Sequence, residues 1–481
     1  MSDQRKPTLT IDDIITATGG RLVRGKTDRV CRGVSTDTRT MLSGNLFIAL
    51  TGDRFDGHDF IPLAVDKGAA SIVIQAGRER DVVSGGRELS VISVNDTVKA
   101  LGDIAHWWRM RFTIPVIAVT GSAGKTTTKE MIASVLSQTK SVIKNRGNFN
   151  NLIGLPLTLL EMNDGHEAAV VEMGTNRPGE ITRLTRIASP DVGVITNVGL
   201  AHLEGLKTLE GVAEEKGALF LGMNTCGTAV VNLDDAAVTR AARQWNGKTV
   251  TFSLNADADV RGAGLRKKGE KGIAFTLTVG RRTGAITMSV LGEHNIYNAL
   301  AAAACSHACG VDYEHICRGL SAFRQVRRRM EVFRLRKGAF LVDDTYNANP
   351  SSVREALKTL RDLAGTGGST LIFGDMLELG DQAEEIHEDI GMVIADTGIT
   401  SLVLRGRFSP AVAAGAAQRG FAEDRIYFIE EPGEIADHVA RFLRGGEWIL
   451  IKGSRGMRME AVTAAILETC GETVAANEVA Q

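Results

Sequence analysis

The chain has 481 residues, with 56 basic and 57 acidic side chains and a formal net charge of −1. At roughly 150 residues per domain, this length predicts three domains. Hydrophobic residues make up 43% of the chain and charged residues 23%, which excludes a disordered chain, a collagen and a coiled coil. The balanced charge gives no electrostatic reason to expect nucleic acid or an acidic membrane as a partner.

The N-terminal segment and the cysteines bear on where the protein works. Residues 1–13 contain no apolar core of a secretory signal, and no apolar run is long enough to span a bilayer. The six cysteines are few for this length and scattered, which favours a reducing compartment over a disulfide scaffold. We therefore expect a soluble protein of the cytoplasm, with no membrane insertion. We also expect a monomer.

One cluster of cysteines and histidines allows two interpretations. It comprises Cys305, His307, Cys309, His315 and Cys317. Thiolate and imidazole are zinc ligands, but the cluster lacks the C-x-x-C spacing of a zinc knuckle. Cys305 and Cys309 lie four residues apart in an Ala-rich run, which places them on one face of a helix. We expect buried cysteines of a core helix rather than a zinc site.

Three compositional zones follow one another along the chain. Residues 1–97 hold short β-rich runs, typical of a small N-terminal α/β domain. Residues 98–325 alternate apolar strands with helical stretches, which predicts a central parallel sheet covered on both faces. Residues 326–481 restart this alternation and predict a C-terminal Rossmann-like domain. The small and polar residues 468–481 are expected to form a frayed tail.

The apolar runs also indicate where ligands would bind. The predicted strands lie at 45–50, 71–76, 89–94, 116–121, 168–174, 192–199, 228–235, 339–344, 370–375, 401–406, 425–430 and 448–453. In doubly wound sheets, ligands bind beyond the carboxyl ends of the strands. Polar residues at these ends are therefore the candidates for chemistry.

The strongest local signal is a glycine-rich loop between an apolar strand and a helical pattern. It reads Gly121, Ser122, Ala123, Gly124, Lys125, Thr126 and Thr127. Such a loop turns successive backbone N–H groups toward phosphate oxygens, and the following helix N-terminus adds partial positive charge. Lys125 can reach the β and γ phosphates of a nucleotide, and the Thr126 hydroxyl can ligate Mg²⁺. Two residues separate the glycines, instead of the usual four. The flanking strand and helix argue against a chance glycine turn.

Three charged residues lie at further strand ends or on a neighbouring helix. Glu172 comes just beyond the apolar residues of the predicted strand at 168–174, and a carboxylate near a phosphate loop would suit Mg²⁺. His202 follows the next strand, and Lys216 lies in a predicted helix. Taken alone, His202 is read as a structural histidine and Lys216 as a solvated surface lysine.

Two polar strings complete the pattern. Residues 292–302 place Asn295 and Asn298 at the start of a helix, where simple capping is the alternative to ligand binding. Residues 343–352 follow a strand and include Pro350, a favourable first helical residue. The density of polar residues at this strand end favours ligand contact over capping alone.

With these strings in view, the chain resembles the Mur ligase family over nearly its whole length. The loop GSAGKTT, the strings at Glu172 and His202 and the string GEHNIYNALAA resemble the family's ATP and metal motifs. The strings GNFNNLIGLPLTLL (147–160), DDTYNANP (343–350) and GDMLELG (374–380) resemble the member that adds a dipeptide. STDTRT (35–40) and DGHDF (56–60) resemble its uridine-nucleotide domain.

The resemblance implies a reaction and a set of domain roles. The protein would be an ATP-dependent ligase that joins D-alanyl-D-alanine to UDP-N-acetylmuramoyl-tripeptide through an acyl phosphate. The product would be the pentapeptide precursor of peptidoglycan. Residues 1–97 would bind the UDP substrate, residues 98–325 would bind ATP, and residues 326–481 would close on ATP and bind the dipeptide.

The resemblance also implies roles for single residues. Lys125 would hold phosphates, Thr126 the first Mg²⁺, and Glu172 and His202 the second, with Lys216 carbamylated into a carboxylate-like metal ligand. Asn295 would contact adenine, and Asp344 the ribose. The residues implied in substrate binding are Ser35, Thr38 and Arg39 for the UDP moiety, Asn150 and Asn151, and Asn347 and Asn349 for the dipeptide.

The chain departs from the family pattern at two places. Gly-Ala-Leu follows Lys216, where the relevant members tend to have Gly-Glu-Ile. The family's Gly-Arg pair before the C-terminal domain is replaced by a run of arginines. Arg329 matches the family arginine best and Arg328 replaces the glycine, so Arg327, Arg328 and Arg329 all remain candidates for the ATP contact.

Other classes of protein fit the sequence less well than the Mur ligase family. A folylpolyglutamate synthetase would lack the strings STDTRT and DDTYNANP, and a guanine nucleotide switch would carry an N-K-x-D or T-K-x-D string, which is absent. A ligase that adds diaminopimelate would resemble a D-N-P-R string, also absent. A non-catalytic ATP-binding scaffold is disfavoured because Lys125, Thr126, Glu172 and His202 are intact. Whether the third peptide residue is diaminopimelate or lysine stays open.

Overall fold

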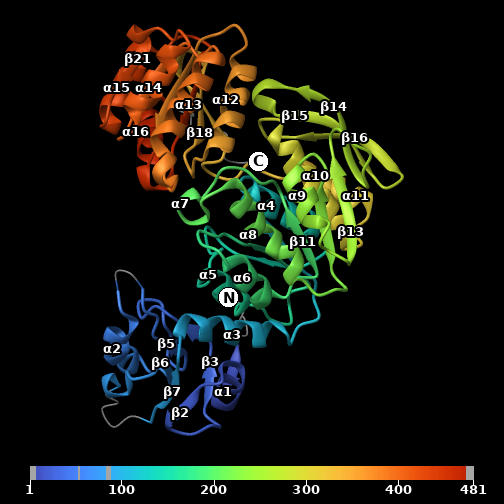
Figure 1. Cartoon of the computed structure of the whole chain (residues 1–481), viewed down its shortest axis with the longest axis vertical. Helices are drawn as coiled ribbons and strands as arrows, with labels where there is room; N and C mark the ends of the chain where they lie inside the picture. Colours follow the sequence, from blue (N-terminus) through green and yellow to red (C-terminus); the bar gives the residue numbers. More distant parts are fainter. Residues whose placement is uncertain (1–6, 53–54, 83–87, 473–481) are drawn as a thin grey trace.

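The structure is a computed structural model that describes residues 7–52, 55–82 and 88–472. Three larger sheets follow one another along the chain, and the central one lies between the N-terminal and C-terminal ones (Figure 1). This arrangement confirms the predicted α/β class with three domains. The limits at 97/98 and 325/326 stay predictions. The first falls at the start of a helix and the second between the last central helix and the next strand.

The N-terminal sheet is built around three short, buried strands. Its order is β2 (Arg21–Arg24), β7 (Ser90–Val94), β6 (Ser71–Gln75), β5 (Leu46–Ile48) and β4 (Val34–Ser35), with β2 antiparallel at one edge. A separate pair joins β1 (Thr8–Thr10) to β3 (Val30–Arg32), and the helices are α1 (Ile11–Thr18) and α2 (Ile61–Asp66). Because β5 to β7 are almost entirely buried, they read as continuous apolar runs.

Helix α3 (Thr97–Arg109) joins the first two domains. It begins after Asp96, whose side chain accepts a hydrogen bond from the Lys99 N–H. Its buried residues Leu101 and Ile104 belong to one hydrophobic cluster that spans the N-terminal domain and one face of the central sheet. The two domains therefore share a core through this helix.

The central sheet has nine strands. Its order is β16 (Arg282–Met288), β15 (Ile273–Val279), β14 (Val260–Lys267), β13 (Lys248–Ser253), β12 (Thr228–Asn232), β11 (Val192–Ile195), β8 (Val116–Thr120), β10 (Ala168–Glu172) and β9 (Val142–Lys144). One face packs on α4 (Lys125–Leu136), α10 (His294–Ala308) and α11 (Tyr313–Ala322). The other packs on α3, α5 (Gly154–Leu159), α6 (Glu180–Ala188), α8 (Leu209–Gly222) and α9 (Ala236–Ala242).

The parallel arrangement predicted for residues 98–325 ends at β14. Strands β14, β15 and β16 form an antiparallel meander, and no α-helix separates them, only a single 3-10 turn (Gly269–Lys271) between β14 and β15. In β15, Ile273, Phe275 and Leu277 are buried, and the residues between them are partly exposed. This period of two is typical of a sheet with one covered face, and it explains why the strand–helix alternation stops here.

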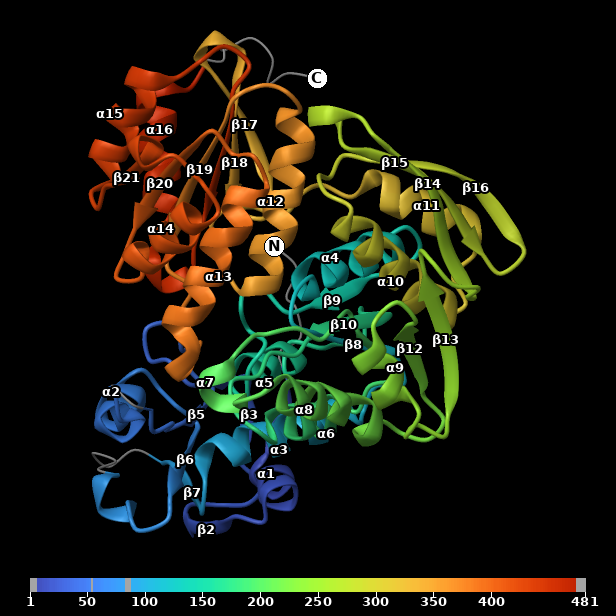
Figure 2. The same ribbon diagram turned by 45° about the horizontal axis from the view of Figure 1, so that its top comes forward.

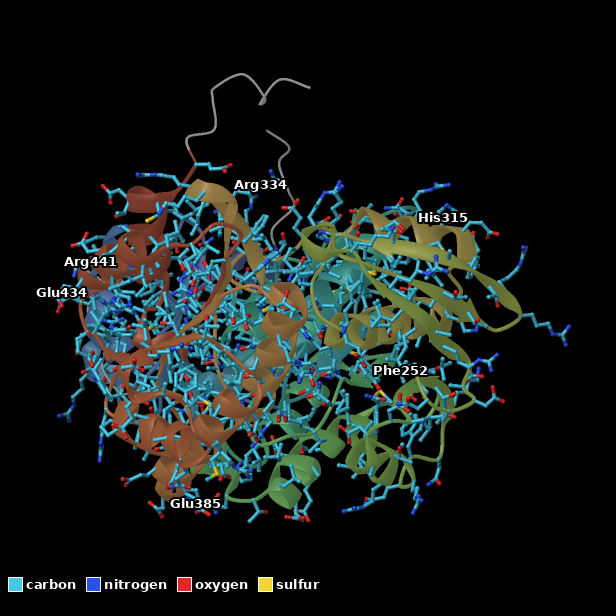
Figure 3. All side chains as sticks on the ribbon, turned by 90° about the horizontal axis from the view of Figure 1, so that it is seen from above. Phe252, His315, Arg334, Glu385, Glu434 and Arg441 are labelled. Carbon is cyan, nitrogen blue, oxygen red and sulfur yellow. The ribbon has the colours of Figure 1, made fainter. Side chains whose placement is uncertain are left out.

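The C-terminal sheet is a second doubly wound sheet with an antiparallel edge. Its order is β17 (Glu331–Leu335), β18 (Ala339–Asp344), β22 (Trp448–Lys452), β19 (Ser369–Gly374), β20 (Ser401–Arg405) and β21 (Ile426–Phe428). One face packs on α12 (Pro350–Ala364), α13 (Ala383–Asp396) and α14 (Ser409–Gln418), and the other on α15 (Pro432–Phe442) and α16 (Glu460–Cys470). The charged residues Glu385 of α13 and Glu434 and Arg441 of α15 are exposed at the outside of the molecule, whereas Phe252 of β13 is fully buried (Figure 3).

The expected tail at 468–481 is wrong for its first residues, which are ordered in the fold. Helix α16 continues to Cys470, and Gly471 forms a β-bridge with Leu335, because Ile466 and Cys470 are buried against the sheet. Residues 473–481 lie outside the described residues. Among the described helices, none combines the length and apolar character needed to cross a membrane.

Candidate active site

The glycine-rich loop connects β8 to α4 as predicted, and its tight path explains its glycines. A Cβ on Gly121 would lie 1.9 Å from the Thr196 Oγ1 atom, so no larger residue fits there. Gly124 has a φ of +81°, in the left-handed region that favours glycine. The loop is also held by Asn197, whose Oδ1 accepts a hydrogen bond of 3.0 Å from the Ala123 N–H.

Lys125 is the first residue of α4 and lies at the centre of the site. Its Nζ donates a hydrogen bond of 2.7 Å to the Gly121 carbonyl. Burial lowers the pKa of Lys125, while the nearby carboxylate of Glu172 raises it and Arg329 lowers it. The ammonium thus lies where an anionic ligand would restore its preference for the charged form.

Thr126 and Glu172 form a buried pair beside this lysine. The Thr126 hydroxyl donates to Glu172 Oε2 at 2.7 Å, and the Asn150 amide donates to Glu172 Oε1 at 2.8 Å. Glu172 is only 3% exposed, at the carboxyl end of β10. A nearly buried carboxylate with these two neutral donors is fixed in position and keeps lone pairs free for a cation.

Arg329 connects this pair to the C-terminal domain. Its Nη2 atom donates to the Thr126 hydroxyl at 2.7 Å, and its guanidinium lies 4.1 Å from the Tyr346 ring centroid. Arg328 instead pairs with Glu460 at 3.2 Å, and Arg327 is exposed outside the cleft. Of the three arginines left open by the sequence, Arg329 alone lines the cleft.

His202 lies after β11, next to the C-terminal domain. Its Nδ1 atom is 2.7 Å from Glu378 Oε2, a residue of the GDMLELG string. Burial lowers the pKa of His202, while the hydrogen bond to Glu378 raises it and the cations of Lys125 and Lys216 lower it. The same hydrogen bond lowers the pKa of Glu378, so a carboxylate accepts from the imidazole N–H.

Lys216 is neither a solvated surface lysine nor part of the cleft lining. It is 1% exposed in α8, and burial, followed by the charge of Lys125, lowers its pKa well below the ordinary value. Its neighbour Glu215 accepts hydrogen bonds from the Thr175 hydroxyl at 3.0 Å and the Gly179 N–H at 2.6 Å. Glu215 therefore fixes α8, and with it Lys216, against the segment that follows β10.

Asn295 and Asn298 are buried in α10 and do not cap it. Glu293 occupies the cap position without a side-chain bond. Asn298 donates to Asn295 Oδ1 at 2.9 Å and accepts from the Thr128 hydroxyl at 3.2 Å, and its Oδ1 faces Gly124. The pair supports the phosphate loop, and both residues also line the cleft. The alternative that Asn295 and Asn298 only cap the helix is therefore wrong.

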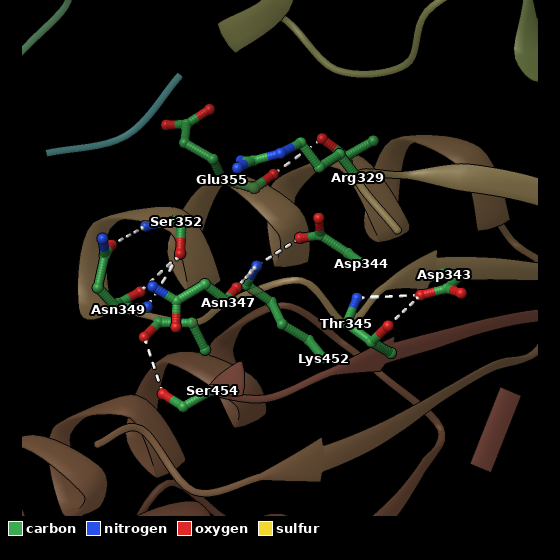
Figure 4. A network of polar contacts seen from close by, with 12 residues as sticks. Arg329, Asp343, Asp344, Thr345, Asn347, Asn349, Ser352, Glu355, Lys452 and Ser454 are labelled. Atoms are coloured by element: carbon green, nitrogen blue, oxygen red, sulfur yellow. Dashed lines mark hydrogen bonds and ion pairs between the residues drawn. The ribbon is translucent and has the colours of Figure 1, made fainter. Parts of the chain in front are cut away.

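The loop after β18 brings residues of the C-terminal domain to the same cleft. Figure 4 shows the polar contacts that hold this loop. Asp344 pairs with Lys452, which also donates to the Asn347 carbonyl at 3.1 Å. Asn349 caps α12 by accepting from the Ser352 N–H at 2.8 Å, as expected before Pro350. The Asn349 amide also donates to the Ser122 carbonyl at 3.2 Å.

These elements enclose a cleft of about 870 Å³ between the central and C-terminal sheets. The predicted site residues that line it are Ser122, Ala123, Gly124, Lys125, Thr126, Thr127, Asn150, Asn151, Glu172, His202, Asn295, Arg329, Asp344, Asn347 and Asn349. Strand ends far apart in the sequence meet here because parallel strands end at one edge of a sheet.

The three predicted residues of the N-terminal domain do not lie in this cleft. Ser35 ends β4 and accepts from the Asp37 N–H at 3.2 Å. The Thr38 carbonyl accepts from Lys67 Nζ at 2.6 Å, and Arg39 is exposed and pairs with Asp37 at 2.7 Å. Their local contacts position the loop after β4, and their role toward the UDP moiety stays a prediction.

Asn197, Glu215 and Glu378 also build the site, although the motifs do not single them out. Asn197 lies in the string noted for His202, and Glu378 lies in the string GDMLELG. Glu215 precedes Lys216 directly. The sequence signal for these three residues is their position close to a motif residue, because the groups that they contact are remote in the sequence.

The donors in the cleft suit magnesium. The hydroxyl of Thr126 and the buried carboxylate of Glu172 are oxygen ligands of the kind that Mg²⁺ prefers, and the Asn150 amide holds that carboxylate in place. Among the residues that the structure describes, no group of three or more His, Cys, Asp or Glu side chains is placed to hold a metal ion. Cys305 is buried in the hydrophobic cluster of α10, as expected for a core cysteine.

A short glycine loop between a parallel strand and a helix, with a buried threonine–carboxylate pair facing a second sheet, defines an α/β nucleotide-binding protein of the P-loop class. Three family models match the chain: the Mur ligase family catalytic domain at residues 30–109, the Mur ligase middle domain at 119–306, and the Mur ligase glutamate ligase domain at 328–455. The chain belongs to the Mur ligase family.

Relatives cover the chain almost completely. The UDP-N-acetylmuramoyl-tripeptide–D-alanyl-D-alanine ligase of Bacillus subtilis (strain 168) is 36% identical over 461 residues, which are 96% of this chain and 98% of the relative. Crystal structure I of MurF from Acinetobacter baumannii matches with a TM-score of 0.87 and 30% identity, covering 96% of this chain and all of that one. MurF ligase from Thermotoga maritima in complex with ADP matches with a TM-score of 0.80 and 29% identity, covering 91% and 97%.

Proposed function

We propose that the protein is an ATP-dependent ligase that joins D-alanyl-D-alanine to UDP-N-acetylmuramoyl-tripeptide. The observation that carries this proposal is the buried Thr126–Glu172 pair beside Lys125, faced by Arg329 and Asn349 of the opposite side of the cleft. Relatives of the same length that carry this activity in their names support the substrates.

The first step is phosphoryl transfer to the tripeptide. The terminal carboxylate of the tripeptide attacks the γ-phosphorus of ATP in line, the bond to the β-phosphate oxygen breaks, and an acyl phosphate and ADP form. Both reactants are anions, so the cations of Lys125 and Arg329 offset their repulsion. The N–H groups of the glycine loop orient the phosphates.

The second step forms the peptide bond. The amine of D-alanyl-D-alanine attacks the acyl carbon, phosphate leaves, and the amine loses its proton. A carboxylate is a poor acylating agent, and its phosphorylation supplies the leaving group. The cleft between the two sheets would exclude water, which would otherwise hydrolyse the acyl phosphate. Asn347 and Asn349 lie on the C-terminal side, where they would face the incoming dipeptide.

Thr126, Glu172, His202 and Lys216 would hold two Mg²⁺ ions, with Lys216 as its carbamate. When bound, Mg²⁺ supplies Lewis-acid polarisation of the phosphoryl oxygens. The lowered pKa of Lys216 favours the neutral amine, which is the form that adds carbon dioxide. Asn295 would contact adenine, and Asp344 the ribose. Ser35, Thr38, Arg39, Asn150 and Asn151 would bind the UDP-tripeptide. A monomeric state and a cytoplasmic location stay predictions.

A ligation assay tests the proposal. The purified protein is incubated with MgATP, UDP-N-acetylmuramoyl-tripeptide and D-alanyl-D-alanine, and ADP release and the pentapeptide product are measured. We expect steady-state ADP release to require both co-substrates. Equal ADP release when either is omitted would reject the function. Tripeptides that end in diaminopimelate and in lysine, run side by side, identify the third residue.

A further inference from the structure

Glu378 and His202 meet across the two sides of the cleft in an unusual pair of backbone conformations. Their side chains are 2.7 Å apart, although 176 residues separate them in the sequence. Both residues have positive φ angles, +56° for His202 and +63° for Glu378. Non-glycine residues adopt this left-handed conformation rarely, and they keep it where surrounding contacts enforce it, often at functional sites.

The backbone around both residues is joined as well. The Glu204 N–H donates to the Glu378 carbonyl at 3.1 Å. Helix α7 (Leu203–Leu206) follows His202 directly, and its residues Leu203 and Leu206 pack in a hydrophobic cluster formed mostly by the C-terminal domain. Figures 1 and 2 both place α7 at the face of the central domain nearest to α13. His202 is thus carried by a central-domain segment whose packing depends on the C-terminal domain.

We propose that Glu378 is a positioning residue: its carboxylate, delivered by the C-terminal domain, orients the His202 imidazole, so that the metal side of the site is complete only when the two domains are docked. The inference rests on the proposed function, in which His202 is a metal ligand.

The chemistry of the pair explains this role. A carboxylate only accepts hydrogen bonds, so the Nδ1 atom of His202 must carry the proton that Glu378 binds. The lone pair of the imidazole then lies on Nε2, with the ring orientation fixed. Carboxylates that bind the other nitrogen of a metal-ligating histidine set its tautomer and orientation in this way. Here that carboxylate comes from a different domain, which links domain docking to ligand geometry.

Three variants distinguish an effect on the orientation of the His202 imidazole from an effect on the docking of the two domains. Glu378→Ala removes the acceptor, and Glu378→Gln keeps a neutral acceptor oxygen. Asp362→Asn is the matched control, because Asp362 pairs with Lys267 at 2.7 Å across the same interface but outside the cleft. The Glu378 side chain is 50% exposed, so its loss should leave the fold intact, which urea unfolding midpoints verify.

The first measurement is the tautomer of His202 in metal-free protein. Side-chain ¹⁵N NMR of histidine-labelled protein reports it, with His202→Gln used for assignment. We expect the Nδ1–H tautomer in the wild type, Glu378→Gln and Asp362→Asn, and its loss in Glu378→Ala. The second measurement is the dissociation constant of Mn²⁺ in the presence of ADP. It should rise about 10- to 100-fold in Glu378→Ala, less in Glu378→Gln, and stay within twofold in Asp362→Asn.

Two results would overturn the proposal. One is an unchanged tautomer and Mn²⁺ affinity in Glu378→Ala. The other is an equal loss of the Nδ1–H tautomer and of Mn²⁺ affinity in Asp362→Asn, which would show that Glu378 acts only as a contact between the domains. Neither measurement uses the tripeptide or the dipeptide, so a failed ligation assay would reject the proposed substrates without deciding this point.

Discussion

The Nη2 atom of Arg329 donates a hydrogen bond of 2.7 Å to the Thr126 hydroxyl, which joins the segment between two domains to the first turn of α4. A cation thereby lies beside the carboxylate of Glu172 and the ammonium of Lys125. The guanidinium of Arg329 also packs over the Tyr346 ring, 4.1 Å from its centroid.

Removal of this guanidinium should weaken nucleotide use. Arg329→Ala loses a charge-assisted hydrogen bond worth about 1.5–3 kcal/mol, so kcat/KM for ATP should fall roughly 10- to 150-fold. Arg327→Ala serves as the control, because Arg327 is exposed outside the cleft, and it should change kcat/KM less than twofold. Similar losses in both variants would contradict the assignment of Arg329 to the ATP site.

Chemical rescue tests the proposed carbamate on Lys216. Lys216→Ala should lose roughly 10- to 100-fold in activity, and short-chain carboxylic acids should restore part of it by replacing the carboxylate. Lys129→Ala is the matched control, since Lys129 is also 1% exposed but donates to the Asn145 carbonyl at 2.8 Å. Any activity lost in Lys129→Ala should not be restored by these acids. Full activity of Lys216→Ala, or rescue of neither variant, would argue against the carbamate.

The contact between Gly124 and Asn298 predicts coupled effects on stability. A Cβ on Gly124 would lie 2.2 Å from Asn298 Oδ1, in addition to the strain of φ +81°. Gly124→Ala should therefore destabilise more than Gly44→Ala, where φ is +83° but no atom lies within 4 Å of the added Cβ. The strain alone is worth about 1–2 kcal/mol.

A double variant isolates the clash. In Gly124→Ala with Asn298→Ala, the loss in unfolding free energy should be smaller than the sum of the single losses, by roughly 0.5–3 kcal/mol. Urea denaturation of the four proteins measures this. Strictly additive losses would show that the two residues do not interact in the folded protein.

His294 predicts a pH dependence of stability. Its Nδ1 atom is buried, and has no hydrogen-bond partner among the described residues. Burial, followed by the cations of Lys452 and Lys358, lowers the pKa of His294 to about 4. An unfolded histidine titrates near 6.5, so between pH 6.5 and 4 the unfolded state binds more protons, and stability falls as pH falls.

His294→Gln removes this contribution. Its unfolding free energy should fall less between pH 7 and 5 than that of the wild type, by up to about 1.4 kcal/mol per pH unit below 6.5. His307→Gln is the control, because His307 is exposed on the same helix, and it should follow the wild type. Parallel curves for His294→Gln and the wild type would refute the buried, neutral imidazole.

Thiol reactivity should follow burial and pKa. Burial raises the pKa of Cys31 to about 11 and that of Cys309 to about 12, and raises the pKa of the buried Cys305, so little thiolate is present at pH 8. Exposed Cys226 should react first with a disulfide reagent. All six cysteines should react after denaturation. A fast phase that persists in Cys226→Ser would contradict this order.

Local patterns were sufficient for much of the fold. The apolar runs at 116–121, 168–174 and 192–199 correspond to β8, β10 and β11, because strands buried on both faces leave a continuous apolar signature. The meander of β14 to β16 was not foreseen. The alternation of buried and exposed residues in these strands is also a local pattern. It lies, however, inside a zone whose other segments alternate strand and helix, and that alternation predicts parallel strands.

The sequence by itself determined the α/β class, the phosphate loop, and the strand ends at which polar residues gather, since burial period and glycine placement are properties of neighbouring residues. Only the tertiary structure decided that Arg329 rather than Arg327 reaches Thr126, that Lys216 is buried, that Asn298 supports Gly124, and that Glu378 meets His202. Each of these contacts joins segments that are remote in the chain. Their geometry depends on how whole sheets and domains pack, for which no local pattern carries information.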